Sequence, residues 1–108
     1  MERKIDYKSV LNRMGYFRSR NKLSFREASL RLGASQSFVN RIERQVTELK
    51  VSTLLNFMDL VNITPTEFFY SEPQNYKKDK EIFDAIQSLS NDDKEAILNI
   101  AKRLSNWF

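Results

Sequence analysis

Apolar residues recur every three to four positions along most of the chain, which is the spacing of one face of an α-helix. No stretch shows the strict alternation of apolar and polar residues that marks a half-buried β-strand. The pattern therefore predicts an all-α protein. The expected helices cover residues 7–21, 25–32, 35–44 and 52–61, a short segment from residue 65, and residues 79–89 and 91–108.

Side chains that satisfy free backbone N–H groups mark where these helices begin. A serine or threonine stands at or just before four of the expected starts, at Ser24, Ser35, Thr64 and Ser90. After Ser24 and Thr64 a glutamate follows three residues later, which is a capping-box pattern. Gly33 follows the second helix, and glycine readily takes the left-handed conformation that ends a helix. The first five helices are too short to be stable alone, so they must pack on one another.

The helices and the charges divide the chain in two. A five-helix domain is expected at residues 7–70, a linker at 71–78 and a helical hairpin at 79–108, with Ile82, Phe83, Ile86 and Leu89 facing inward. Residues 1–50 hold twelve Lys/Arg and five Asp/Glu, a net charge of +7, and residues 51–108 hold six and nine, a net of −3. The basic half favours a polyanionic partner, although chance clustering on a solvated surface gives the same charges.

Composition disfavours an enzyme. The chain of 108 residues has no cysteine, no histidine and only two glycines. Without cysteine there are no disulfides or thiol nucleophiles, and without cysteine and histidine the commonest transition-metal ligands and the usual general base are absent. Two glycines are too few for a glycine-rich phosphate loop. The catalytic groups that remain are pairs of carboxylates such as Asp92 and Asp93, but these two lie where a helix N-terminus favours negative charge. No enzymatic activity, cofactor or metal is expected. No secretory or membrane-spanning segment is recognised, so the protein is expected to be cytoplasmic with no membrane partner.

Residues 25–44 combine a helix, a tight turn and a second helix. The small Ser29 lets two helix backbones approach, Gly33 permits the turn, and Val39 and Ile42 can wedge the second helix against the first. Two short helices crossing through such a turn are the plan of a DNA-binding helix-turn-helix.

The same segment resembles the phage-repressor (Xre-type) helix-turn-helix family. The resemblance covers about residues 10–70 and is carried by Leu23-Ser24, Glu27, residues 32–37 (LGASQS), Val39, residues 41–44 (RIER), residues 53–55 (TLL) and residues 65–69 (PTEFF). Phe25 stands where the family commonly has glutamine, and Gln45 stands where it has glycine. The resemblance implies a five-helix domain that binds double-stranded DNA.

The helix expected from Ser35 to Arg44 has one apolar side and one polar side. Helical geometry places Gln36, Ser37, Asn40, Arg41 and Arg44 within an arc of about 140°. Glutamine and asparagine can pair with adenine and arginine with guanine. The resemblance implies that Gln36, Ser37 and Asn40 face bases and that Arg41 faces bases or phosphate. Without the resemblance, a polar stripe on a helix is more often a solvated surface.

Other residues are expected near the DNA backbone or in support of the helices. Phosphate contacts are expected from Lys22, Ser24, Arg26, Arg44 and Lys50, and Arg20 and Arg31 are further basic neighbours. For each basic residue, an ordinary exposed charge is an equally good interpretation. Ser24 can also serve only as a helix cap. The resemblance implies that Arg18 and Glu43 form a structural salt bridge.

The C-terminal helices offer a second surface. The last helix carries an apolar stripe of Ile97, Ile100, Leu104, Trp107 and Phe108. This stripe can hold a homodimer, bind a partner such as a toxin or antagonist protein, or pack back on the first domain. A helix-turn-helix of this size reads few base pairs, so two copies on a two-fold operator are expected. The leading hypothesis is a dimeric, sequence-specific transcriptional regulator, a repressor; the alternative is a protein-interaction module, such as an antitoxin or antagonist-binding regulator, acting through the C-terminal helices.

Overall fold

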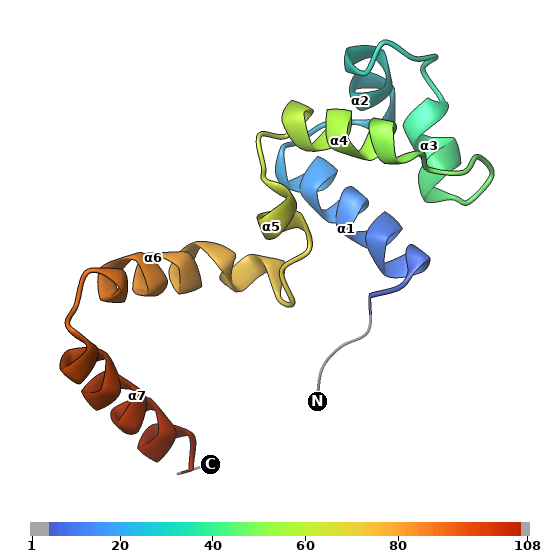
Figure 1. Cartoon of the computed structure of the whole chain (residues 1–108). Helices are drawn as coiled ribbons and strands as arrows, with labels where there is room; N and C mark the ends of the chain where they lie inside the picture. Colours follow the sequence, from blue (N-terminus) through green and yellow to red (C-terminus); the bar gives the residue numbers. More distant parts are fainter. Residues whose placement is uncertain (1–4, 107–108) are drawn as a thin grey trace. The chain divides into compact units, whose positions relative to one another are not determined.

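The computed structural model describes residues 5–106, and every regular element in that range is helical (Figure 1). This confirms the all-α prediction. The elements are α1 Tyr7–Arg20, α2 Phe25–Arg31, α3 Phe38–Glu43, α4 Val51–Leu60, α5 Pro65–Phe68, the 3₁₀ turn η1 Pro73–Asn75, α6 Tyr76–Gln87 and α7 Asn91–Ser105.

Three of the expected helix caps are present. The side-chain oxygens of Ser24, Thr64 and Ser90 each accept a hydrogen bond from the backbone N–H three residues later, at 3.0, 3.2 and 3.1 Å. These bonds satisfy N–H groups that the first helical turn leaves free. Helix α1 begins with a full capping box between Asp6 and Ser9, which the sequence analysis did not identify.

The expectation for the third helix was wrong at its start. Residues 36 and 37 form a turn, and α3 begins at Phe38 instead of Ser35. The carbonyl of Ser35 accepts from the N–H of Phe38 at 3.0 Å, and Ser37, at the N-cap position, makes no side-chain capping bond. A serine in front of a helical pattern did not by itself fix where this helix begins, because the tight turn extends to Ser37.

Four helices end at a residue in the left-handed conformation. The positive φ angles are 57° at Lys22, 75° at Gly33, 63° at Gln45 and 57° at Asn62, one residue beyond the C-caps of α1, α2, α3 and α4. Each end has the paired backbone bonds of a Schellman motif; after α3 the N–H of Val46 bonds to the carbonyl of Arg41 at 2.8 Å and that of Gln45 to Ile42 at 3.0 Å. Of these four ends, only the one at Gly33 was predicted from the sequence.

Gln45→Gly is expected to stabilise the protein by about 0.5–1 kcal/mol. The left-handed conformation costs an L-residue roughly 1–2 kcal/mol, and the extra freedom of glycine in the unfolded chain returns part of that gain. Gly33→Ala is the opposite control, because nothing lies within 4 Å of an added Cβ and only the backbone conformation is penalised. Urea unfolding of both variants measures the two changes. A loss of stability in Gln45→Gly would contradict the assigned conformation.

The core lies among α1 to α5. Its buried apolar side chains are Leu11, Met14, Phe17, Leu23, Ala28, Val39, Ile42, Phe57, Met58, Val61 and Phe68. The rings of Phe17 in α1 and Phe68 in α5 stack with their centroids 5.7 Å apart. Helix α3, of only six residues, contributes two side chains that are completely buried, Val39 and Ile42, so its position is set by the core.

Arg13 is a buried cation in α1 that the sequence analysis missed. Its guanidinium donates to the carbonyl of Phe68 at 2.8 Å, to that of Tyr70, and to that of Ser71 at 3.3 Å. These carbonyls follow or end α5, where a helix leaves acceptors unpaired. Arg13 therefore holds the chain after α5 against α1.

The chain divides into two compact units between Pro73 and Gln74. Helix α6 begins at Tyr76, so much of the expected linker at 71–78 is helical. No residue of α6 or α7 is buried, and the prediction that Ile82 and Phe83 face inward was wrong: they are 53% and 55% exposed. On the exposed surface of α6 a hydrogen bond to Asp84 raises the pKa of Lys80 above its ordinary value.

Among the helices within residues 5–106, none has the length and apolar character needed to cross a bilayer.

Candidate nucleic-acid interface

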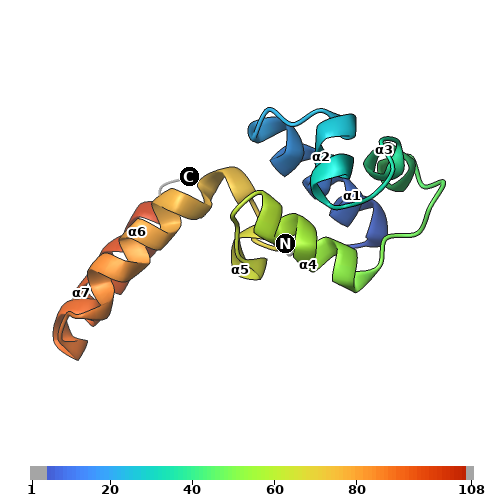
Figure 2. The ribbon, with the colours of Figure 1, turned by 90° about the horizontal axis from the view of Figure 1, so that it is seen from above.

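Helix α3 lies at the outer edge of the first unit, in contact with α2 and α1 (Figures 1 and 2). Val39 and Ile42 anchor one side of it in the core. On the other side Gln36, Ser37, Arg41 and Arg44 are exposed and Asn40 is half-buried. The five residues expected to face DNA are therefore spread over the turn before α3, the helix and its C-cap, and four of them are freely accessible.

The residues expected to contact phosphate come from three other helix ends. Lys22 follows α1, Ser24 and Arg26 lie at the start of α2, and Lys50 is the N-cap residue of α4; all four are exposed. The oxygen of Ser24 is engaged in capping α2. Each side chain is therefore open to solvent, and the three cations of this group have no ion-pair partner among the described residues.

The structure brings together two candidates that the sequence analysis treated separately. The Nε of Arg26 donates to the amide oxygen of Gln36 at 3.2 Å, which joins the first turn of α2 to the turn before α3. With its oxygen occupied in this way, Gln36 keeps its amide N–H groups as donors. The further basic neighbours Arg20 and Arg31 are instead paired with Glu67 at 3.5 Å and with Glu27 at 2.6 Å.

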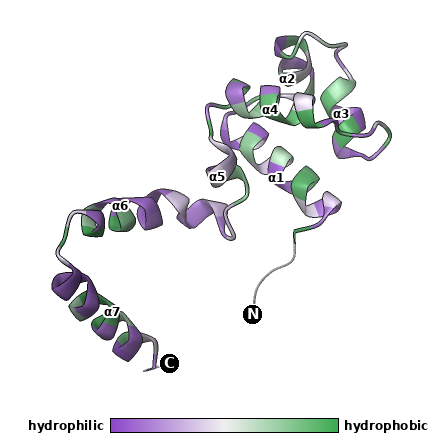
Figure 3. Cartoon of the chain, viewed as in Figure 1, coloured by the Kyte–Doolittle hydropathy of each residue, from purple (hydrophilic) through white to green (hydrophobic). Residues whose placement is uncertain are grey.

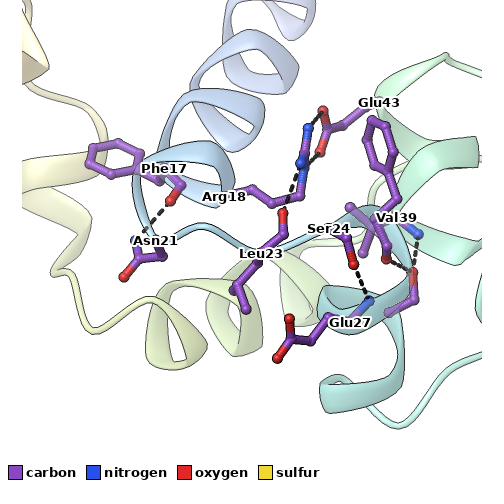
Figure 4. A network of polar contacts seen from close by, with 10 residues as sticks. Phe17, Arg18, Asn21, Leu23, Ser24, Glu27, Val39 and Glu43 are labelled. Atoms are coloured by element: carbon purple, nitrogen blue, oxygen red, sulfur yellow. Dashed lines mark hydrogen bonds and ion pairs between the residues drawn. The ribbon is translucent and has the colours of Figure 1, made fainter.

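Arg18 and Glu43 form an ion pair that links α1 to the last residue of α3 (Figure 4). The Nε of Arg18 lies 2.8 Å from Glu43 Oε2, and a second guanidinium nitrogen lies 3.3 Å from Oε1. The third nitrogen donates to the carbonyl of Leu23 at 2.9 Å, and the guanidinium carbon lies 3.9 Å from the centre of the Phe25 ring. The two side chains are only 14% and 13% exposed. Phe25 thus covers this ion pair from the start of α2.

Gly15 allows the Glu43 carboxylate to approach the backbone of α1. A Cβ at this position would lie 2.9 Å from Glu43 Oε1, closer than side-chain atoms normally approach. Because the carboxylate is held on both oxygens by Arg18, it has little freedom to move aside. Glycine at residue 15 therefore leaves the space that the ion pair between Arg18 and Glu43 needs, and this ion pair positions α3.

Ser29 has a polar role that the sequence analysis missed. It is completely buried; its hydroxyl donates to the carbonyl of Phe25 at 2.7 Å and accepts from the backbone N–H of Val39 at 2.9 Å. Val39 is the second residue of α3, and its N–H is one that a local cap would satisfy. Ser29 in α2 therefore caps α3 across the turn, in place of Ser37.

Ser29→Ala is expected to destabilise the protein by roughly 1–3 kcal/mol, because the buried N–H of Val39 loses its acceptor. Ser37→Ala is the matched control and should change the free energy of unfolding by less than about 0.5 kcal/mol, since Ser37 is exposed and makes no capping bond. Thermal or urea unfolding followed by circular dichroism compares the two. Equal losses in both variants would contradict the cap across the turn.

Within residues 5–106 no three histidine, cysteine, aspartate or glutamate side chains are grouped to hold a metal ion. Comparisons of the chain with models of protein families, with curated proteins and with solved structures found no match.

Proposed function

We propose that this protein is a sequence-specific double-stranded DNA-binding transcriptional regulator, a repressor of the phage-repressor (Xre) type, that reads the major groove with α3 and the turn before it. The observation that supports this most is the two-sided construction of α3. One side is fixed in the core by Val39 and Ile42, and the other presents Gln36, Ser37 and Arg41 to solvent. A recognition helix needs both properties, a rigid support and an accessible polar edge.

The chemistry of the exposed edge fits base recognition. Arginine can donate two hydrogen bonds to guanine, and asparagine can pair with adenine; these are roles for Arg41 and Asn40. Gln36, with its oxygen bonded to Arg26, offers donors to acceptors on a base edge. Lys22, Arg44 and Lys50 add exposed positive charge from three separate helix ends, as phosphate contacts require. Bound across an operator, such a protein represses by blocking polymerase access.

Selection of bound duplexes from a random DNA pool tests this function. The expected result is a two-fold motif whose half-sites are roughly 34–36 Å apart. Failure to enrich any motif over the starting pool would overturn the proposal.

Replacing Arg41 separates base reading from backbone binding. Arg41→Ala is expected to lose roughly 1–3 kcal/mol of discrimination at one base pair of each half-site, whereas Lys50→Ala should weaken binding to all sequences alike. Competition binding with single-base variants of the selected duplex measures both. Uniform weakening by Arg41→Ala would place that side chain on phosphate and not on a base.

The exposed apolar residues of α6 and α7 favour a second candidate, a module that binds another protein, such as an antagonist or toxin. A chain shortened after Pro73 tests it. This end point keeps the carbonyls of Tyr70 and Ser71 that Arg13 binds. Loss of a captured protein partner with unchanged DNA affinity would favour this candidate.

A further inference from the structure

Between residues 74 and 106, the described part of the second unit, no apolar side chain is buried. Units shorter than about 40 residues usually need disulfides, a metal or association with another chain to be stable. This unit, residues 74–108, belongs to a chain with no cysteine or histidine. Association is the remaining route for a pair of helices that leave most of their large apolar side chains exposed.

Each helix of this unit carries its apolar residues as a stripe (Figure 3). In α7 the residues Ile97, Ile100 and Leu104 follow one another at spacings of three and four, and they are 39%, 54% and 60% exposed. Spacings that alternate between three and four residues are those of helices that pack side by side. The stripe of α6 runs through Ile82, Phe83 and Ile86, and Leu89 follows in the connection. The connection between the two helices is only residues 88–90.

Charge changes sign along both helices, in opposite senses. The first five residues of α6 carry three lysines and one aspartate, and its remaining seven carry Glu81 and Asp84, so its net charge goes from +2 to −2. The first five residues of α7 carry three acidic residues and one lysine, and its remaining ten carry Lys102 and Arg103, so its net charge goes from −2 to +2. The order in α7 suits the helix dipole, but the order in α6 opposes it.

These gradients distinguish packing within one chain from packing between two copies. If α6 and α7 of one chain lay antiparallel along each other, their basic ends would meet and their acidic ends would meet. If α7 lay antiparallel on α7 of a second copy, the acidic end of each would meet the basic end of the other. The same holds for α6 against α6. Like charges brought together select against an arrangement, and opposite charges fix the orientation.

We infer that α7 is an interface for a second copy of this chain, packed antiparallel on α7 of that copy with Ile97, Ile100 and Leu104 between the two helices. A two-fold axis across α7 makes the interface self-complementary, as homodimer contacts are. Helix α6 carries a stripe and a charge gradient that suit the same symmetry. Trp107 and Phe108, which the sequence analysis assigned to this stripe, lie outside the described residues. The inference does not depend on DNA binding.

Sedimentation velocity of the full chain without DNA tests the interface. The expected species at about 0.1 mM is a dimer, because an association with Kd near 1 µM is nearly complete at that concentration. The double variant Ile100→Glu/Leu104→Glu should raise Kd roughly 100-fold or more, because two apolar side chains are no longer buried. Asn99→Glu, which adds a carboxylate on the opposite side of α7, is the matched control and should dimerise as the parent chain does.

Charge reversal tests the orientation. Lys102→Glu/Arg103→Glu makes both ends of α7 acidic and should raise Kd roughly tenfold at low salt. Adding Asp92→Lys/Asp93→Lys should restore much of the affinity, with circular dichroism confirming that helix content is kept. A monomeric parent chain, a dimer unaffected by Ile100→Glu/Leu104→Glu, or no recovery on the second reversal would overturn the inference. Because no DNA is present, these results are separate from the duplex selection.

Discussion

Replacing Arg18 with methionine is expected to destabilise the protein by roughly 3 kcal/mol, since removing one partner of a largely buried ion pair leaves the other charge unpaired. The variant loses both bonds to Glu43, the bond to the carbonyl of Leu23 and the contact with Phe25. The value lies at the low end of the range for buried pairs because both side chains keep some contact with water. A decrease in Tm of roughly 10–20 °C should accompany it.

The double variant Arg18→Met/Glu43→Leu is the control for this prediction. It removes both charges, so it should be less destabilised than the sum of the two single variants. Urea unfolding of all four proteins gives the coupling free energy, which is expected at about 1–3 kcal/mol. Strict additivity would mean that the ion pair is a contact of no energetic consequence.

Salt is expected to weaken DNA binding steeply. Lys22, Arg26, Arg44 and Lys50 are four candidate phosphate contacts in each copy, and eight contacts in a dimer predict a slope of log K against log salt of about −7. Between 50 and 200 mM salt the affinity should then fall about 10⁴-fold. Fluorescence anisotropy with the selected duplex over this salt range measures the slope.

Lys50→Ala should make that slope shallower by about 1 for each copy, because one phosphate contact is lost. Asp59→Ala, a change to an exposed residue of opposite charge on the same helix, is the control and should leave the slope steep. A nearly flat salt dependence of the parent protein would remove the electrostatic basis of the proposed function.

The sequence predicted the helices well where local chemistry decides them. Ser24, Thr64 and Ser90 could be identified as caps because the residues that cap and the N–H groups they bind are neighbours in the chain. The buried side of α3, with Val39 and Ile42, also follows from helical spacing alone. The exposed edge of α3 could be predicted in the same way, because it lies opposite the apolar side of the helix.

The features that the sequence did not predict depend on contacts across the fold. Ser29 has the small size that a close helix crossing needs, but its bond to the N–H of Val39 exists only once α3 is in place. Arg13 carried no prediction, because the carbonyls after α5 that it binds are brought to it only by the fold. Lys22 and Gln45 adopt a conformation that local preference assigns to glycine, because the helix ends that they form are fixed by packing on both sides.

Gly15 makes the orientation of α3 sensitive to a position far from its exposed edge. Alanine is the better helix former by about 1 kcal/mol, so a design guided by helix propensity alone would replace this glycine. The new methyl group would displace the Glu43 carboxylate, through which Arg18 holds the C-terminal end of α3. Under the proposed function, a mutation in a different helix would then alter operator affinity while every DNA-facing side chain remained intact. In a genetic screen it would appear as a loss of repression that maps outside the DNA-facing residues.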